Sequence, residues 1–367
     1  MTPRRLLLGP GPSNPHPRVL AALGEPVLGH LDPAFLAILD ECQARLRGLF
    51  GTENLLTLPL SATGSGGMEA CLANLLERGD PAVIGVAGVF GERMCDVARR
   101  IGAGVERVET EPGTALAADA MASAIERVRP RVVAFVHAET STGVLQPVEE
   151  IAAAARRAGA LVVLDCVTSL GGSEVALDRW GVDAAYSATQ KCLSCPPGLS
   201  PVSFSPRAVE RVRVRRKPVQ SWYFDVTLLS AYYGSERVYH HTAPISMVYA
   251  LAEALRIVDE EGLAARAARH RDAAQALVER MAGLGFAPLV APALRLPSLT
   301  TLRLPEAVLA RGEAALRRRL LEEHGIEVGG GLGKLAGAVW RVGLMGENAR
   351  RESVERLAGA LERLLGA

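Results

Sequence analysis

The sequence contains very little lysine. Among the 41 lysine and arginine residues of the 367-residue chain, only Lys191, Lys217 and Lys334 are lysines. Lys191 lies in the stretch "SATQKCL", which has almost no other charge. Because the chain otherwise uses arginine, we expect Lys191 to have a role that arginine cannot fill.

The chain also lacks an excess of charge of either sign. Its formal net charge is +1, and its 22% charged and 49% hydrophobic residues are typical of a globular protein. This balance gives no electrostatic reason to expect nucleic acid or an anionic membrane as a partner. The arginines of 211–216, "RVRVRR", alternate with valine, which favours the solvated edge of a strand or helix over a nucleic-acid patch.

Long hydrophobic runs are absent as well. No segment approaches the roughly 18 apolar residues that a membrane span needs. The apolar start, Leu6 to Leu8, is soon interrupted by prolines and is too short for a signal-peptide core. The chain ends in "RLLGA" and not in a peroxisomal address. We therefore expect a cytoplasmic protein that does not bind membranes.

Cysteine is used sparingly and without a metal-binding pattern. Most of the six cysteines lie within or beside apolar stretches, which predicts buried free thiols in a reducing compartment. The "CLSC" at 192–195 has no second pair to complete a zinc site. Because the second pair is missing, we expect no metal. The two prolines that follow this pair also argue against a redox motif.

Strand and helix patterns alternate through the first two thirds of the chain. The predicted strands at 82–87, 132–137 and 161–165 are continuous apolar runs with helical patterns between them. Such runs are typical of strands covered by helices on both faces, so an α/β fold with a mainly parallel sheet is predicted.

The pattern changes to long amphipathic helices after Pro244. Two further strands, at 298–304 and 338–344, alternate with helices at 312–324 and 348–365. We expect a smaller α+β domain there. The predicted division is an N-terminal arm (1–20), a large domain (21–255) and a small C-terminal domain (256–367).

Three features fall where ligands gather in such a fold, at the carboxyl ends of the strands. "SATGSGGMEA" at 61–70 is a small-residue turn that enters a helix, either a plain helix start or a phosphate seat. Asp165 stands at the end of a buried strand. Its side chain could serve as a helix cap, a metal ligand or a partner for a ring nitrogen. Lys191 is either a surface lysine or an amine whose lowered pKa makes it nucleophilic. Arginine stays protonated and cannot act in this way.

Taken together, the three features match the protein groups that bind pyridoxal 5′-phosphate (PLP). The cradle would hold the phosphate, and Asp165 would keep the ring nitrogen protonated so that the ring accepts electrons. Lys191 would form a Schiff base with the aldehyde, yield to the incoming amino acid and then move its α-proton.

The same stretches carry a family resemblance. In chain order they are "LLLGPGPSNPHPRV", "SATGSGGMEA", "ETSTGVLQP", "LVVLDCVTSLGG", "YSATQKCLSCPPG", "VYHHTAP" and "VWRVGLMG". The chain resembles class V aminotransferases of the alanine–glyoxylate and serine–glyoxylate (serine–pyruvate) branch. The resemblance implies a fold type I PLP-dependent transferase with a seven-stranded sheet.

The resemblance also implies roles for individual residues. Lys191 and Asp165 are catalytic, the phosphate is bound by Thr63, Gly64, Ser65 and Gln190, and the ring is contacted by Phe90, Thr140 and Val167. The family often has tryptophan where this chain has Phe90, and some members have histidine where Ser65 stands. We expect Phe90 to stack on the ring as well, with less contact area.

Substrate and partner contacts follow from two other stretches. Arg341 interrupts an apolar strand, and its planar fork matches a carboxylate. The resemblance assigns it to the substrate carboxylate, with Gly11 beside it, although a structural ion pair is the alternative. Tyr239 and Thr242 are implied to reach the phosphate of a neighbouring subunit, which predicts a homodimer with shared sites. His240 and His241 are expected to point to opposite faces of an extended chain, which argues against a metal site.

Cysteine desulfurases share the fold but need a late reactive cysteine, and none follows Cys195. The activity of an (S)-ureidoglycine–glyoxylate aminotransferase, from the same branch of the family, is an alternative that the sequence leaves open. A PLP-dependent regulator would need an added helix-turn-helix, which we do not expect. A non-catalytic PLP-binding protein is disfavoured by the presence of both Lys191 and Arg341. The expected activity is a transaminase that takes the amino group of alanine or serine and passes it to glyoxylate or pyruvate.

Overall fold

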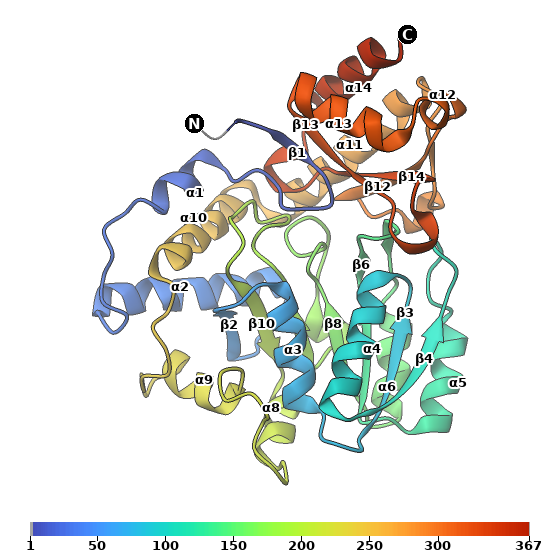
Figure 1. The fold of residues 1–367 in the computed structure, drawn as a ribbon. Helices are drawn as coiled ribbons and strands as arrows, with labels where there is room; N and C mark the ends of the chain where they lie inside the picture. Colours follow the sequence, from blue (N-terminus) through green and yellow to red (C-terminus); the bar gives the residue numbers. More distant parts are fainter. Residues whose placement is uncertain (1–2, 367) are drawn as a thin grey trace.

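A seven-stranded sheet forms the centre of the large domain (Figure 1). The computed structural model describes residues 3–366. The sheet order is β2-β10-β9-β8-β5-β3-β4. The bounds are β2 (Leu56–Leu60), β3 (Pro81–Val86), β4 (Gly104–Glu109), β5 (Val132–Val136), β8 (Leu161–Asp165), β9 (Ala184–Tyr186) and β10 (Ser200–Phe204). Only β10 runs antiparallel to its neighbours in this sheet. The predicted mainly parallel α/β sheet is confirmed.

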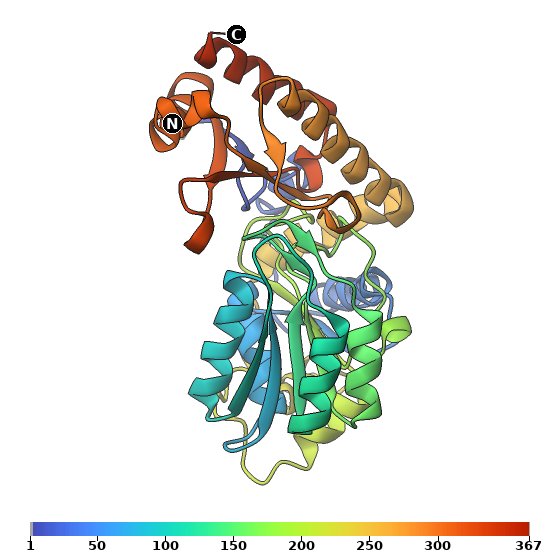
Figure 2. The ribbon, with the colours of Figure 1, turned by 90° about the vertical axis from the view of Figure 1, so that its right-hand side faces the viewer.

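Helices cover both faces of this sheet, as Figure 2 shows in a side view. On one face, α3 (Gly64–Leu75) packs beside α4 (Val89–Ile101). On the other face, α5 (Ala118–Val128) packs beside α6 (Glu149–Arg157). Because both faces are covered, every residue of β5 and β8 is buried. This burial accounts for the continuous apolar runs in the sequence.

The large domain contains further helices besides these two pairs. They are α1 (Pro17–Ala22), α2 (Pro33–Phe50), α7 (Leu177–Trp180), α8 (Pro206–Arg213), α9 (Val226–Tyr233) and α10 (Ile245–Glu261). Helix α10 packs against both α1 and α2. None of the helices within residues 3–366 is long and apolar enough to cross a membrane.

A second, five-stranded sheet forms the small domain in the order β1-β13-β14-β12-β11. The strands are β1 (Leu6–Leu8), β11 (Ala287–Pro288), β12 (Leu299–Arg303), β13 (Ile326–Gly330) and β14 (Val339–Gly343). The helices are α11 (Leu263–Ala282), α12 (Glu306–Ala310), α13 (Glu313–His324) and α14 (Arg351–Leu365). Strand β1 pairs in parallel with β13, and its Leu6 and Leu8 join the small domain's apolar core.

The division between the domains differs in detail from the prediction. Part of the expected N-terminal arm is strand β1, which belongs to the small-domain sheet. The expected boundary at residue 255 lies inside α10, and the large apolar core extends to Val258. Helix α10 ends at Glu261 and α11 begins at Leu263, with Gly262 between them at φ +79°. This left-handed conformation favours glycine and lets the chain turn from one domain into the other.

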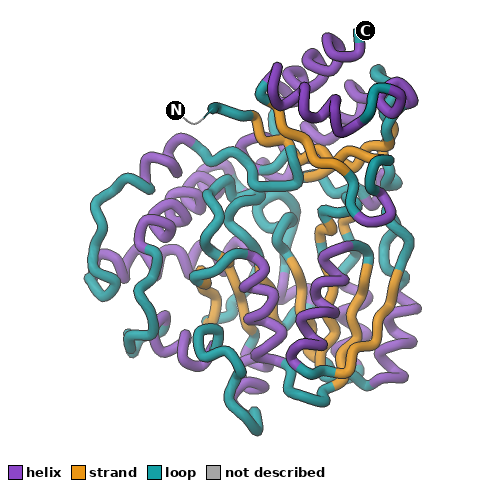
Figure 3. Tube along the Cα trace, viewed as in Figure 1, coloured by secondary structure: helices purple, strands orange, loops and turns teal. Residues whose placement is uncertain are grey.

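Loops and one short hairpin lie between the large-domain sheet and the small domain (Figure 3). The hairpin is formed by β6 (Ala138–Glu139) and β7 (Val144–Leu145). The carboxyl ends of β5, β8 and β9 open toward these loops, which is where ligands are expected in a sheet of this kind.

The stretch 211–216 begins at the end of α8, where Arg211 pairs with Glu77 at 3.1 Å and with Asp80 at 2.7 Å. All six cysteines are buried and free, as the sequence predicts.

Candidate active site

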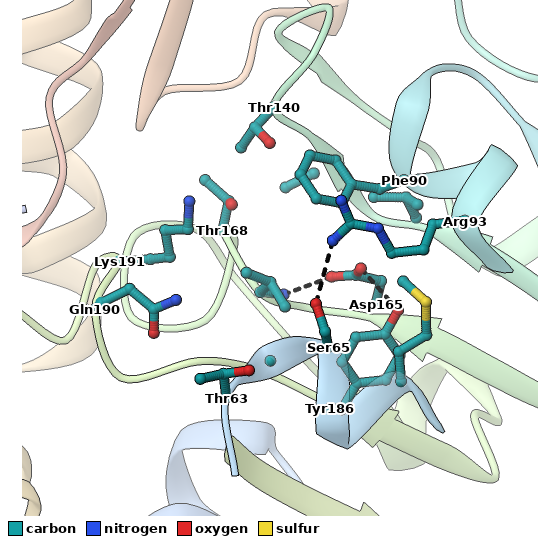
Figure 4. A pocket seen from close by; sticks show the side chains of 15 residues that line it. Thr63, Ser65, Phe90, Arg93, Thr140, Asp165, Thr168, Tyr186, Gln190 and Lys191 are labelled. Carbon is teal, nitrogen blue, oxygen red and sulfur yellow. Dashed lines mark hydrogen bonds between the residues drawn. The ribbon is translucent and has the colours of Figure 1, made fainter. Parts of the chain in front are cut away.

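A cavity lies at the carboxyl ends of β8 and β9, between the amino ends of α3 and α4 (Figure 4). Most of the predicted site residues line it. The lining residues are Thr63, Gly64, Ser65, Met68, Phe90, Arg93, Val136, Ala138, Thr140, Asp165, Val167, Thr168, Tyr186, Gln190 and Lys191. The cavity therefore gathers residues that are separated by more than 120 positions in the chain.

Asp165 forms the floor of this cavity and is 2% exposed. Its Oδ1 accepts a hydrogen bond of 2.8 Å from the backbone N–H of Val167, and its Oδ2 accepts one of 2.8 Å from the Tyr186 hydroxyl. Burial raises the pKa of Asp165 to about 7, and the two hydrogen bonds work in the opposite direction. A cationic group in the cavity would stabilise the ionised carboxylate.

Lys191 approaches the cavity from the loop that follows β9. Burial, with a smaller contribution from the positive charge of Arg341, lowers the pKa of Lys191 to about 8. A sizeable fraction of the amine is therefore neutral near physiological pH, which an arginine side chain cannot achieve. This property accounts for a lysine at position 191 in a chain that otherwise uses arginine.

Gly11 lies directly beside this lysine, and the Lys191 ammonium donates a hydrogen bond to the Pro10 carbonyl. Gly11 has φ +107°, and a Cβ there would come within 2.8 Å of Lys191 Cε. Both the left-handed backbone and the close approach require glycine. Gly11 thus adjoins the site through its backbone, although it is not among the residues that line the cavity.

The phosphate seat predicted from the sequence falls at the start of α3. Thr63 is the N-cap residue, and its side chain makes no capping hydrogen bond. The first N–H groups of a helix have no intrahelical acceptor and attract anions. Gly64 allows the start of this helix to pack closely against Ala188, since a Cβ at position 64 would lie 3.0 Å from the Ala188 Cβ. On the opposite side, Gln190 Oε1 is buried without a protein partner among the described residues.

Phe90, for which the sequence predicts a stacking role, lies at the start of α4. Ser141 Oγ accepts a hydrogen bond of 3.0 Å from the Val89 N–H, and Ser141 in turn donates to Glu139 Oε1 at 2.5 Å. Glu139 is fully buried, and burial raises its pKa. This chain of contacts ties α4 to the β6–β7 hairpin and so positions Phe90 on the cavity wall.

Arg341 connects the small domain to this site. It is 7% exposed, its Nε donates to the Gly330 carbonyl at 2.7 Å, and its Nη1 donates to the Thr140 carbonyl at 3.2 Å. Burial lowers the pKa of Arg341. None of the ion pairs found within residues 3–366 includes this guanidinium. The alternative of a structural ion pair therefore finds no partner, and the fork is available to a carboxylate.

Gly11 and Arg341 are not among the residues that line the cavity, and neither are the predicted site residues Tyr239 and Thr242. Tyr239 and Thr242 are exposed, and Tyr239 packs against His30 with ring centres 5.0 Å apart. The expectation that the side chains of His240 and His241 point to opposite faces is wrong. Their Nδ1 atoms lie 2.8 Å apart, because the chain bends at these residues and is not extended as a strand is.

Six lining residues have no predicted role: Met68, Arg93, Val136, Ala138, Thr168 and Tyr186. Tyr186 lies directly opposite Asp165 in the pairing of β8 with β9. It was part of the motif at 186–198, but only the strand register shows that its hydroxyl reaches the carboxylate.

These residues fit PLP. The buried carboxylate suits a protonated ring nitrogen, and the lysine of lowered pKa suits an aldehyde. The uncapped start of α3 suits a phosphate. Phe90 and Val167 supply apolar contacts for a ring.

The whole chain is similar to known aminotransferases. The family model "Aminotransferase class-V" matches residues 18–357. An alanine–glyoxylate aminotransferase from Oryctolagus cuniculus is 41% identical, over 99% of this chain and 93% of the relative. An (S)-ureidoglycine–glyoxylate transaminase from Bacillus subtilis is 37% identical, over 99% and 91%. The crystal structure of an alanine–glyoxylate aminotransferase from Nostoc sp. superposes with a TM-score of 0.97 at 52% identity, covering 100% of this chain and 96% of the other.

Proposed function

The chain belongs to the class V aminotransferase family and is a PLP-dependent transaminase, and we propose that it transfers the amino group of a small amino acid to a small 2-oxo acid. Alanine or serine is the proposed donor, and glyoxylate or pyruvate is the proposed acceptor. The names of the relatives from Oryctolagus cuniculus and Nostoc sp. support alanine and glyoxylate.

Each role in this reaction is filled by a residue whose geometry suits it. When bound, PLP supplies an electron sink for the negative charge left at Cα as the Cα–H bond breaks. Asp165 holds a proton on the ring nitrogen, Lys191 moves the proton at Cα, and Arg341 holds the α-carboxylate. Asp165 and Arg341 are buried and Lys191 is partly buried, which limits the access of water and strengthens their electrostatic interactions.

The observation that carries the proposal is the buried guanidinium of Arg341, which forms no ion pair within residues 3–366 and whose charge lowers the pKa of Lys191. A buried arginine whose protein partners are two carbonyl groups is suited to an incoming carboxylate. An amino acid and a 2-oxo acid present the same carboxylate, so one residue serves both halves of the reaction.

A second candidate keeps glyoxylate as the acceptor but takes (S)-ureidoglycine as the donor. It is favoured by the Bacillus subtilis relative, whose identity of 37% is close to that of the alanine–glyoxylate relatives. The two candidates share Lys191, Asp165 and Arg341 and differ in the donor side chain.

We also propose that the working form is a homodimer in which Tyr239 and Thr242 complete the neighbouring subunit's site. The support is the exposure of large apolar side chains around these residues. Trp222 is 61% exposed, Val238 54% and Tyr239 57%. Exposed apolar side chains gathered in one region are typical of a surface that another chain covers.

A donor–acceptor matrix tests the substrate proposal. The purified protein is incubated with alanine, serine, aspartate or (S)-ureidoglycine against glyoxylate, pyruvate or 2-oxoglutarate, and the products are quantified by chromatography. We expect the fastest transfer from alanine or serine to glyoxylate or pyruvate, and none with Lys191→Ala. Preferential use of aspartate with 2-oxoglutarate would overturn the proposal, and faster transfer from (S)-ureidoglycine would select the second candidate.

A further inference from the structure

Arg93 lines the cavity but has no role in the reaction described above. It follows Phe90 by three residues on α4, so the two side chains share a face of the helix. Its Nη1 donates a hydrogen bond of 3.1 Å to Ser65 Oγ, and its guanidinium carbon lies 5.1 Å from the centre of the Phe90 ring. Figure 4 shows the guanidinium over the start of α3, with the bond to Ser65 drawn as a dashed line.

The charge of Arg93 has no acidic partner in residues 3–366. The preceding residue, Glu92, is engaged by Arg107. Further along the same helix, Arg100 pairs with Asp96 at 2.9 Å. Arg93 is instead held by a hydroxyl group and an aromatic face, which leave most of its hydrogen-bond donors free. An arginine held in this way is ready to bind an anion.

The seat at the start of α3 is otherwise without a cation. Thr63, Gly64, Ser65 and Gln190 offer hydroxyl, amide and backbone groups but no full positive charge. The other cation on the cavity wall is Lys191, and its amine is committed to the aldehyde. A phosphate dianion is bound more strongly by a guanidinium fork than by neutral donors alone.

We propose that Arg93 binds the phosphate group of PLP, together with the first turn of α3. Ser65 and Phe90 hold its guanidinium in place. This inference rests on the use of PLP and deepens the proposed function by adding a cofactor-binding residue. It does not depend on which amino donor or acceptor is used.

Cofactor titrations test this role apart from transamination. The cofactor-free protein is titrated with PLP and, in parallel, with pyridoxal, which lacks the phosphate; binding is followed by absorbance. Arg93→Gln removes the charge, and Arg93→Lys keeps the charge without the fork. Arg100→Gln removes an arginine from the same helix, away from the cavity, and is the matched control.

We expect Arg93→Gln to raise the Kd for PLP about ten- to hundredfold, as for the loss of a hydrogen bond to a charged group. The Kd for pyridoxal should stay unchanged. Arg93→Lys should lie between wild type and Arg93→Gln, and Arg100→Gln should match wild type. Inorganic phosphate should compete with PLP in the wild type and much less in Arg93→Gln.

Two results would overturn the proposal. If PLP and pyridoxal weaken equally, Arg93 acts through the Phe90 ring and not on the phosphate. If neither weakens, Arg93 is not a cofactor ligand at all. Should Arg93→Gln fail to fold, the comparison of PLP with pyridoxal in Arg93→Lys decides between the same outcomes. None of these titrations involves a substrate, so failure of the proposed donors would leave the result intact.

Discussion

The Tyr186 hydroxyl donates a hydrogen bond of 2.8 Å to Oδ2 of Asp165, across adjacent strands of the central sheet. Both side chains are buried, and this bond stabilises the ionised carboxylate. Tyr186 is a positioning residue, since it acts on the ring nitrogen only through Asp165. The pair therefore links the stability of the cofactor-free protein to pH.

Replacement of Tyr186 by phenylalanine should change that pH dependence. The folded pKa of Asp165, about 7, is above its unfolded value, so the folded state holds the proton more tightly. Stability then falls as pH rises from about 4 to about 7. Without the Tyr186 bond the pKa of Asp165 rises further, so in Tyr186→Phe the fall should continue to higher pH. Urea unfolding of the cofactor-free protein between pH 5 and 9 measures this.

Tyr233→Phe is the matched control. Tyr233 is also buried, and its hydroxyl donates to the Pro59 carbonyl at 2.9 Å, away from any carboxylate. Its loss should lower the free energy of unfolding by about 1 kcal/mol at every pH. If the free energy of unfolding of Tyr186→Phe is also lowered by the same amount at every pH, Tyr186 is not coupled to the ionisation of Asp165.

Asp165→Asn should remove this titration and stabilise the cofactor-free protein. The gain at pH 8 is on the order of 2–4 kcal/mol, because the buried charge is no longer formed. The same change should leave PLP bound but slow transamination, because asparagine cannot hold the ring nitrogen in its protonated form. Unfolding curves and single-turnover rates measure the two effects. A variant with full rate would contradict the assignment of Asp165 to the ring nitrogen.

The sequence alone was sufficient for residues whose role follows from residue type and motif. Lys191 is recognisable because a lysine in an apolar motif contrasts with an arginine-rich chain, and Asp165 because it ends a buried strand. The parallel sheet follows from continuous apolar runs. These signals are local, so they can be identified without knowledge of the fold.

Other parts depend on contacts between distant segments. The role of Tyr186 requires the register of β8 with β9, and that of Arg93 requires α4 to pack beside the start of α3. Strand β1 is only three residues long and is stabilised by pairing with β13, more than 300 positions away. No periodicity in the sequence encodes such contacts.

Lys191→Arg should be as inactive as Lys191→Ala. Arginine keeps a positive charge but has no neutral amine to link to the aldehyde or to move a proton. Borohydride reduction should fix the cofactor to the wild-type chain and to neither variant, which mass spectrometry can detect. Lys217→Arg, in an exposed stretch, is the control. Retained activity in Lys191→Arg would remove Lys191 from its catalytic role.

Arg341→Ala should raise KM for the amino acid and for the 2-oxo acid together. Both substrates lose the same carboxylate partner, and loss of one member of such a pair costs on the order of 2–5 kcal/mol. Arg303→Ala, an exposed arginine in the same small-domain sheet, should change neither KM. Steady-state kinetics with each substrate varied in turn measures the effect. An unchanged KM for both substrates in Arg341→Ala would leave the residue with a purely structural role.

Co-expression of two inactive variants tests the proposed shared site. One parent is Lys191→Ala. The other is the double variant Tyr239→Ala with Thr242→Ala, provided that it is inactive too. In a mixed dimer one site takes Lys191 from the second parent and Tyr239 with Thr242 from the first, so it is intact, while the other site carries every lesion. Random assembly makes about half of the dimers mixed, so roughly a quarter of wild-type activity should return.

The alternative arrangement predicts a different result. If Tyr239 and Thr242 served the same chain's site as Lys191, every site in the mixture would carry a lesion. Activity would then stay at the level of the parents. Differently tagged chains, purified through both tags in succession, show whether mixed dimers have formed. Isolated mixed dimers have one intact site of two, so they should reach about half of wild-type activity. Mixed dimers without activity would rule out the shared site, because the shared arrangement gives every mixed dimer one intact site. The exposed Tyr239 would then have a role in packing only.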